Sequence, residues 1–99
     1  MSEKLIKQKA LAELKKEGYR AWCPVRPSFG YAEVDIFGVF DCIAIKKEKL
    51  RFIQWTTSIN INARIRKIEA FFNGKPKVYI PCEVWGWHNK KKVFIKKDL

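Results

Sequence analysis

The sequence lacks the features that would place it in or on a membrane. It has no apolar stretch of membrane-spanning length, and the first residues, Met1 to Lys4, contain no apolar signal-peptide core. We find neither a lipidation signal nor a separate basic amphipathic helix, so an anionic membrane is not the expected partner. A cytoplasmic protein is therefore expected.

Cysteine and histidine are also sparse. The three cysteines, Cys23, Cys42 and Cys82, are odd in number and widely spaced, which predicts neither a disulfide framework nor a zinc site. Because Cys42 and Cys82 lie in apolar segments, we expect reduced, buried, structural thiols. The single histidine, His88, is expected in a turn without a catalytic role.

Acidic residues are few relative to basic ones. Ten acidic residues face 21 basic ones, for a formal net charge of +11. This excess favours a phosphate-rich partner, although a merely basic surface is an equal alternative. With 99 residues, 47% hydrophobic and 14% aromatic, the chain has the composition of one globular domain, residues 1–99, with a modest core.

The first half of the chain predicts a helix followed by three strands. Ser2 can cap a helix that runs to about Glu17, and Gly18 ends it. No repeat, linker or low-complexity segment interrupts the pattern, and residues 28–33 are expected to form a loop. The predicted strands cover residues 19–25, 35–46 and 50–57, the last two forming a hairpin around a polar turn at 47–49.

The second half predicts a helix and two more strands. Ser58 or Asn60 opens a helix from Ile61 to about Phe72, which Asn73 and Gly74 close. Strands are expected at residues 77–87 and 92–96, and Pro81 indicates an edge strand or a bulge. The order is thus α-β-β-β-α-β-β, in which the strand-helix-strand unit should be a right-handed parallel crossover.

Two polar side chains interrupt the apolar strands. Asp41 lies within the run Val39 to Ile45, and Gln54 lies within the next strand. Burying a carboxylate is costly unless it has a partner. If the strand is regular, Asp35 and Asp41 share a face with Phe37, Val39 and Ile43, while Gln54 shares a face with Phe52 and Thr56.

The predicted hairpin would bring Asp41, Gln54 and Asp35 together. Hard cations such as Mg²⁺ prefer oxygen ligands and keep several waters, and such an ion can assist phosphodiester hydrolysis. In the alternative interpretation, Asp41 and Gln54 bond to backbone donors or to each other. The spacing leaves both interpretations open.

These segments resemble the PD-(D/E)XK nuclease superfamily, in particular its archaeal Holliday-junction-resolvase-like and phage endonuclease-like branch. Phe40-Asp41-Cys42-Ile43-Ala44 is similar to the strand that carries the family's "PD", and Ile53-Gln54-Trp55-Thr56 to its "(D/E)XK" strand. Asp35-Ile36-Phe37-Gly38 is similar to a "DxFG" variant of small relatives. The resemblance covers the chain from the first helix to about Val84. It implies a restriction-endonuclease-like αβββαβ core, a mixed sheet flanked by helices in the α/β (α+β) class, followed here by a C-terminal strand.

The sequence departs from the family pattern at several positions. Gln54 replaces the acidic residue of the second motif strand, and Thr56 replaces its lysine. The family's first helix supplies a glutamate, and counting back from Gly18 places that position at Lys7. A repair is expected in which Lys7 substitutes for the strand lysine, and Asp35 and Glu3 substitute for the missing acidic ligands.

The resemblance implies a catalytic set and an ion. The catalytic residues would be Asp41, Gln54, Thr56 and Lys7. The ligands of Mg²⁺ or Mn²⁺ would be Asp41, Gln54, Asp35 and Glu3. The expected substrate is DNA, branched or single-stranded forms included, and two-fold symmetry makes a homodimer plausible. The alternatives are an inactive nucleic-acid-binding module of the same fold, or a protein-interaction subunit with exposed tryptophans.

Basic residues on several segments are candidates for contacts to phosphates. Arg64 and Lys67 lie three apart on one helical face, and a basic turn lies next to Trp85 and Trp87. Stacking of these tryptophans on bases is one interpretation, and packing in a core or a dimer is the favoured one. The full predicted nucleic-acid-binding set is Arg20, Arg26, Arg64, Arg66, Lys67, Lys90 and Lys91.

Overall fold

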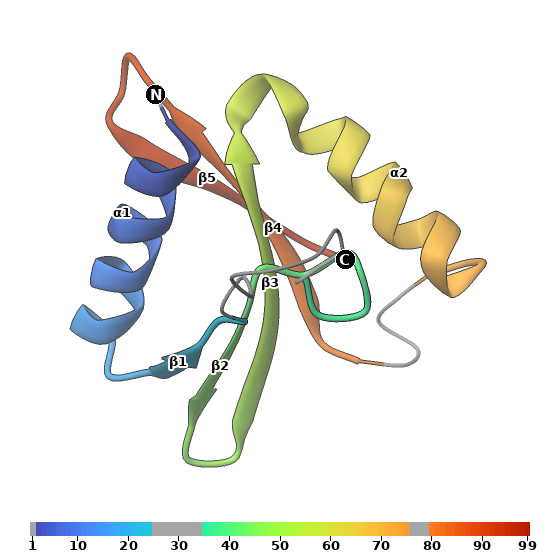
Figure 1. Cartoon of the computed structure of the whole chain (residues 1–99), viewed down its shortest axis with the longest axis horizontal. Coiled ribbons are helices and arrows are strands. Elements are labelled where there is room, and N and C mark those ends of the chain that lie inside the picture. The colour runs from blue at the N-terminus through green and yellow to red at the C-terminus, as the bar shows by residue number, and fades with distance from the viewer. Residues whose placement is uncertain (1, 25–34, 76–79) are drawn as a thin grey trace, which may run out of the picture.

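The chain adopts a mixed α+β fold in which a five-stranded sheet separates two helices (Figure 1). The computed structural model describes residues 2–24, 35–75 and 80–99. None of the helices in these ranges is long and apolar enough to cross a membrane. The elements are α1 (Glu3–Lys16), β1 (Arg20–Trp22), β2 (Cys42–Lys46), β3 (Lys49–Thr57), the 3₁₀ turn η1 (Ser58–Asn60), α2 (Ile61–Phe72), β4 (Cys82–His88) and β5 (Val93–Asp98).

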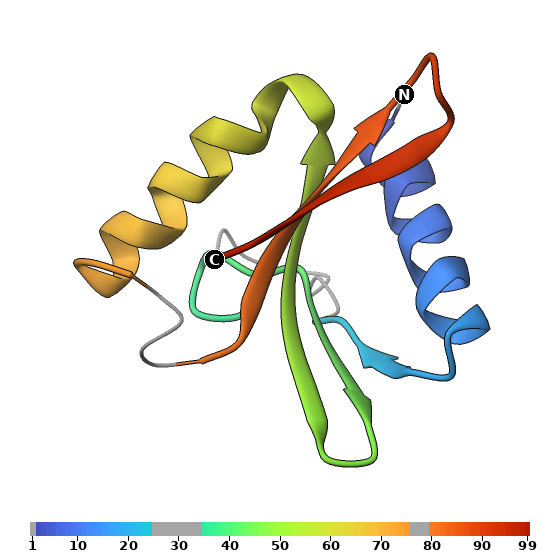
Figure 2. The ribbon, with the colours of Figure 1, turned by 180° about the vertical axis from the view of Figure 1, so that it is seen from behind.

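The sheet has the strand order β1-β2-β3-β4-β5, so its strands are neighbours in the order in which they occur along the chain. Strands β3 and β4 run parallel, joined through α2, and the other three pairs are antiparallel. Seen from behind, α2 follows β3 and returns the chain to the start of β4 (Figure 2). The predicted order α-β-β-β-α-β-β and the parallel crossover pair are therefore confirmed.

Local interactions explain where α1 begins and where both helices end. The Ser2 hydroxyl accepts a hydrogen bond from the Leu5 amide at the start of α1. Gly18, with φ +88°, reverses the chain after α1, and the Tyr19 amide bonds back to the Leu14 carbonyl. Asn73 adopts the left-handed conformation that ends α2. The predicted limits of both helices hold to within one residue.

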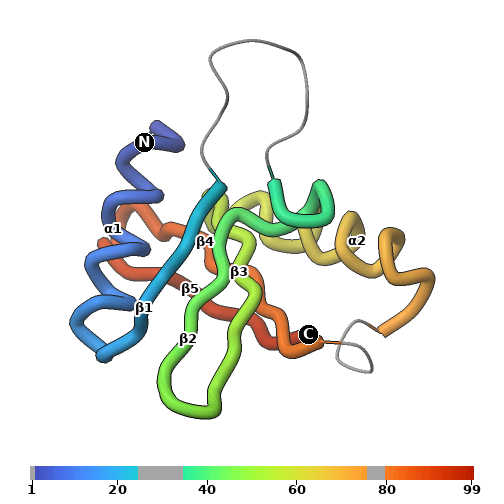
Figure 3. Tube along the Cα trace, turned by 60° about the horizontal axis from the view of Figure 1, so that its bottom comes forward, coloured from blue at the N-terminus to red at the C-terminus, as the bar shows by residue number. Residues whose placement is uncertain are grey.

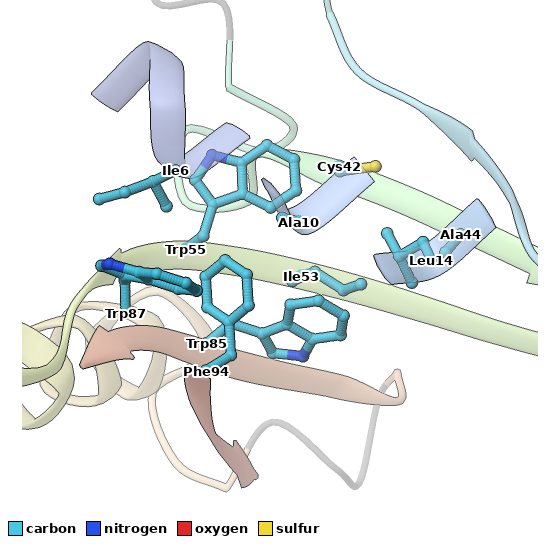
Figure 4. Packing of buried hydrophobic residues seen from close by; sticks show 10 residues of the cluster. All are labelled: Ile6, Ala10, Leu14, Cys42, Ala44, Ile53, Trp55, Trp85, Trp87 and Phe94. Carbon is cyan, nitrogen blue, oxygen red and sulfur yellow. The ribbon is translucent and has the colours of Figure 1, made fainter. Parts of the chain in front are cut away.

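Two hydrophobic clusters hold the helices against opposite faces of the sheet. The Cα trace in Figure 3 shows α1 and α2 on opposite sides of the strands. The α1-side cluster contains the buried tryptophans, with the Trp55 ring between Ile6 and Ala10 of α1 (Figure 4). Trp85 and Trp87 are buried in it, which confirms core packing for this pair. The α2-side cluster consists of Val39, Phe40, Phe52, Ile61, Ile68, Cys82 and Val84.

The prediction of a continuous strand from Asp35 to Lys46 was wrong. A tight turn precedes β2, in which Phe37 (φ 54°) and Gly38 (φ 72°) both have left-handed backbone conformations. The Ile36 amide and the Phe40 carbonyl close this turn with a hydrogen bond of 2.8 Å. The turn lets Phe40 enter the α2-side cluster, and it abolishes the expected alternation of faces between Asp35 and Asp41.

Smaller expectations also need correction. Strand β1 ends at Trp22, and the loop predicted at 28–33 lies outside the described residues. Pro81 precedes β4, which pairs on both sides, so this proline marks neither an edge strand nor a bulge. Cys42 and Cys82 are buried as expected, whereas Cys23 is only half-buried.

Gly86 permits the close approach of η1 and α2 to β4. A Cβ atom at this position would lie 2.4 Å from the side chain of Ile61 and 2.9 Å from the Cα of Ser58. Both distances are below van der Waals contact. The glycine therefore lets the chain leave β3, pass over β4 and begin α2 within a few residues.

Candidate functional site

Asp41 lies immediately before β2, at the point where β3 continues beyond its neighbour. The Asp41 amide donates to the Ile53 carbonyl over 2.8 Å, and the Trp55 amide donates to Asp41 Oδ2 over 2.8 Å. The carboxylate thus accepts a hydrogen bond from the Trp55 amide of β3, which lies beyond the last residue that β2 pairs with. Asp41 Oδ1 has no hydrogen-bond partner among residues 2–24, 35–75 and 80–99.

An open pocket of about 610 Å³ borders this carboxylate. We call it the Asp41 pocket. The N-terminal half of α1 supplies one wall, and the ends of β1 and the turn before β2 supply the other. Its described lining residues are Glu3, Lys4, Lys7, Cys23, Pro24, Asp35, Asp41 and Trp55.

The structure brings four of the predicted site residues together in this pocket. Asp35 and Asp41 meet because the turn at Phe37 and Gly38 folds the chain back, rather than because a regular strand aligns them. Glu3 and Lys7 come from α1, one helical turn apart. Glu3 and Lys7 of α1 therefore lie near Asp41 as expected. Asp35 also lies near Asp41, but through the turn at Phe37 and Gly38 and not through the regular strand that was expected.

Neither Gln54 nor Thr56 is among the described residues that line the Asp41 pocket. Gln54 is 3% exposed and points from β3 toward the face that carries the α2-side cluster. With its amide nitrogen toward Asp41, Gln54 donates to Asp41 Oδ2 over 3.2 Å and also to the Val39 carbonyl. In this orientation Gln54 holds the carboxylate. Its role as an ion ligand stays a prediction.

The pKa of Asp41 is raised from 3.8 to about 7. Burial of the carboxyl group is the main cause, and the negative charges of Asp35 and Glu3 add to it. The hydrogen bond from the Trp55 amide and the charge of Arg64 act in the opposite direction. A site where burial and nearby carboxylates oppose ionisation favours a bound cation or proton.

This pKa predicts how stability should depend on pH. Between about pH 4 and about pH 7 the folded chain keeps a proton on Asp41 that the unfolded chain has lost, so the free energy of unfolding should fall as the pH rises. Asp41→Asn cannot titrate. In a chelating buffer its stability relative to the wild type should therefore be greater at about pH 8 than at about pH 4, by about 2 kcal/mol after allowance for partial solvent contact.

Denaturant unfolding of both proteins at the two pH values measures this difference. Glu48→Gln, on the exposed turn between β2 and β3, is the matched control and should show no such dependence. An Asp41→Asn difference that is the same at both pH values would contradict the ionisation penalty.

A second, smaller pocket adjoins the first through the shared residues Glu3 and Trp55. It encloses about 240 Å³, and its other lining residues are Ile6, Thr56, Thr57 and Arg64. Thr56 is 8% exposed. Arg64, in the first turns of α2, lines this second pocket, whereas Lys67, three residues further along the same helix, lines neither of the two pockets.

The remaining predicted phosphate contacts are dispersed. Arg20 is exposed on the edge strand β1, and Arg66 and Lys67 are exposed on α2. Lys90 and Lys91 are exposed in the turn between β4 and β5. Arg26 lies outside the described residues. Unlike Arg64, none of these remaining candidates lines either of the two pockets within the described part of the chain.

The donor chemistry of the Asp41 pocket fits a hard cation. Its anionic groups are the oxygen donors Asp41, Asp35 and Glu3, the ligand type that Mg²⁺ and Mn²⁺ prefer. In the described ranges no three His, Cys, Asp or Glu side chains converge into a ready-made metal cage. Mg²⁺ commonly binds through one or two carboxylates and keeps several waters. Asp41 and one neighbouring carboxylate would therefore be enough protein ligands for it.

Comparison with known proteins adds no assignment: no protein-family model, curated protein or solved structure matches the chain. Function must therefore be inferred from the site itself.

Several residues of the site have no signature in the sequence. Trp55 contributes its backbone amide to Asp41 and also lines both pockets. Lys4 and Cys23 line the Asp41 pocket, and neither belongs to a recognisable motif. The alternation of faces along β3 could have placed Trp55 toward α1, but its contact with Asp41 depends on where β2 begins.

Proposed function

We propose that this chain is a metal-dependent DNA endonuclease with a divergent PD-(D/E)XK site, in which α1 to β4 form a restriction-endonuclease-like core. The observation that carries the proposal is the Asp41 carboxylate at the border of an open pocket, with its pKa raised to about 7 beside Asp35 and Glu3. The mixed sheet with one helix on each face is compatible with such a core. The net charge of +11 suits a polyanionic substrate.

Each residue of the pocket has a part in this proposal. Asp41 is the central ligand, and Asp35 or Glu3 is the second carboxylate. Gln54 and the Trp55 amide hold Oδ2 of Asp41, which leaves Oδ1 to bind the ion. Lys7 and Arg64 are the cations that hold the scissile phosphate from the α1 and α2 sides. A bound Mg²⁺ or Mn²⁺ supplies Lewis-acid stabilisation of the phosphate and lowers the pKa of its bound water.

A cleavage assay tests this function. Branched, single-stranded and duplex DNA are incubated with the wild type in Mg²⁺, in Mn²⁺ and in chelator, alongside Asp41→Ala. Cleavage should require the ion and should be lost in Asp41→Ala, while Glu48→Ala on the exposed β2–β3 turn should cleave like the wild type. If neither the wild type nor Asp41→Ala cleaves any substrate at high protein concentration, with either ion, the catalytic proposal is wrong.

The second candidate is an inactive nucleic-acid-binding module. It is favoured by the orientation in which Gln54 points its amide nitrogen at Asp41, and by Thr56 where the family has a lysine. Such a module should bind DNA with an affinity that falls steeply with salt and is indifferent to divalent ions at equal ionic strength. Trp85 and Trp87 are buried, whereas Trp22 is 60% exposed, so the interaction-subunit alternative stays a prediction that depends on Trp22. A homodimer stays a prediction.

A further inference from the structure

Cys23 lines the Asp41 pocket, and Cys42 is the first residue of the neighbouring strand β2. Strand β1 pairs with β2 so that Trp22 lies opposite Ile43. Continuing this antiparallel register by one residue on each strand sets Cys23 opposite Cys42. The two thiols lie close enough to interact, and both residues belong to or pack against the α1-side cluster.

Opposed residues on antiparallel strands have the spacing that a disulfide requires. Their Cα atoms are ~4.5–5.5 Å apart, which lies within the ~4.4–6.8 Å found for disulfides. Both sulfurs are free thiols in the present structure. Forming the bond would therefore need rotation of two side chains and little movement of the backbone.

The two thiols differ in access from solution. Cys23 is half-buried and lines the open pocket, whereas Cys42 is fully buried at the margin of the α1-side cluster (Figure 4). Cys82 is buried in the α2-side cluster, on the other face of the sheet. A reagent that enters the pocket therefore reacts with Cys23 first, and Cys42 can then react only with the sulfur of Cys23.

We propose that Cys23 and Cys42 are a redox-active pair, in which Cys23 reacts with a low-molecular-weight disulfide such as glutathione disulfide and Cys42 resolves the product. The Cys23 thiol gives its proton to solvent, and its sulfur attacks glutathione disulfide, forming a Cys23–glutathione bond and releasing one glutathione, which takes up a proton. The Cys42 thiol then loses its proton and its sulfur attacks the sulfur of Cys23, releasing the second glutathione. The pair is oxidised by two electrons, and glutathione disulfide is reduced to two glutathiones.

The inference does not depend on nuclease activity, since it rests on the pairing of β1 with β2 and on the access of Cys23. It does place a covalent bond beside the proposed ion site. Cys42 follows Asp41 in the chain, and Cys23 lines the same pocket as Asp41. The oxidised form would fix the end of β1 against the start of β2 at the rim of that pocket.

The test uses glutathione disulfide on the reduced, folded wild type, followed by intact-mass and peptide mass spectrometry without reductant. The wild type should lose two hydrogens, with the bond mapped between Cys23 and Cys42 and little retained glutathione. Cys42→Ala should instead accumulate one glutathione on Cys23. Cys23→Ala should retain Cys42 and Cys82 unmodified, and in the wild type Cys23 should react at least about ten times faster than Cys82.

Mapping on the wild type keeps the test decisive even if an alanine variant unfolds, and circular dichroism shows whether each variant is folded. Modification of Cys82 as fast as Cys23, or a stable Cys23–glutathione adduct that never closes onto Cys42 in the wild type, would overturn the proposal. Loss of DNA cleavage would not bear on it, so the two proposals can fail separately.

Discussion

Replacing Asp41 by asparagine should weaken the binding of Mn²⁺ to the chain by at least about 100-fold. Partners that only orient a ligand contribute about 10- to 100-fold to metal affinity, and Asp41 is proposed as the ligand itself. Asparagine keeps an oxygen to accept the hydrogen bond from the Trp55 amide, so the β2–β3 contact should survive. The loss should therefore report the missing charge. Isothermal titration of Mn²⁺ at about pH 8 measures it.

The wild-type affinity should also depend on pH. Because an ion competes with the proton on Asp41, whose pKa is about 7, the apparent affinity should fall about tenfold for each pH unit below that value. Asp35→Asn and Glu3→Gln should cost less than Asp41→Asn, and Glu48→Gln should cost nothing. Unchanged Mn²⁺ affinity in Asp41→Asn would place the carboxylate in an architectural role, as an acceptor for the β3 backbone.

Most of the fold follows from local signals in the sequence. Ser2, Gly18 and Asn73 mark the helix limits by capping, and these effects act within a few residues. The segment before β2 was predicted wrongly because apolar residues from Val39 onward read as strand, whereas Phe37 and Gly38 turn the backbone. A phenylalanine with positive φ is uncommon. Its ring packs with Phe52 and Phe71, 6.3 and 5.9 Å between centroids, which is a tertiary cause that the sequence pattern does not contain.

The candidate site was predictable in part. The cost of a carboxylate in an apolar segment singled out Asp41, and helical spacing placed Glu3 and Lys7 on one side of α1. The role of Gln54 beneath Asp41 depends on the amide's contacts with Asp41 and the Val39 carbonyl, which arise from the turn. The same turn decides that Asp35 reaches the pocket, so pairing of strands alone could not give the geometry.

A buried ion pair on the α1 side of the sheet had no sequence signature at all. Arg51 of β3 donates to Glu83 of β4 through Nε, over 2.8 Å to Oε2, and through Nη2 to Oε1. The indole of Trp85 donates to the same carboxylate. The guanidinium carbon of Arg51 also lies 4.8 Å from the ring centroid of Tyr19 and 5.4 Å from that of Trp85. Glu83 is 6% exposed, so its charge depends on these partners.

Exchanging Glu83 for glutamine should destabilise the fold by about 3 kcal/mol, because it leaves the Arg51 guanidinium largely buried without its main counter-charge. Glu83 is the chief cause of the raised pKa of Arg51 in the wild type. Even without Glu83 an arginine keeps its proton at neutral pH, so Arg51 cannot relieve the loss by giving up its proton. Glu17, whose Oε2 lies 3.4 Å from Arg51 Nη1, offers a weaker and more exposed replacement. Urea unfolding of wild type and Glu83→Gln at neutral pH measures the change.

The double variant Arg51→Met with Glu83→Gln separates an unpaired charge from lost packing. Replacing both ends of a buried pair by uncharged groups is often close to neutral, so the double variant should recover at least about half of the stability that Glu83→Gln loses. Glu48→Gln, which removes an exposed carboxylate by the same chemistry, should change stability by less than about 0.5 kcal/mol. A loss in Glu83→Gln no larger than in Glu48→Gln would mean that Glu17 and water solvate Arg51 well enough to make the β3–β4 pair dispensable.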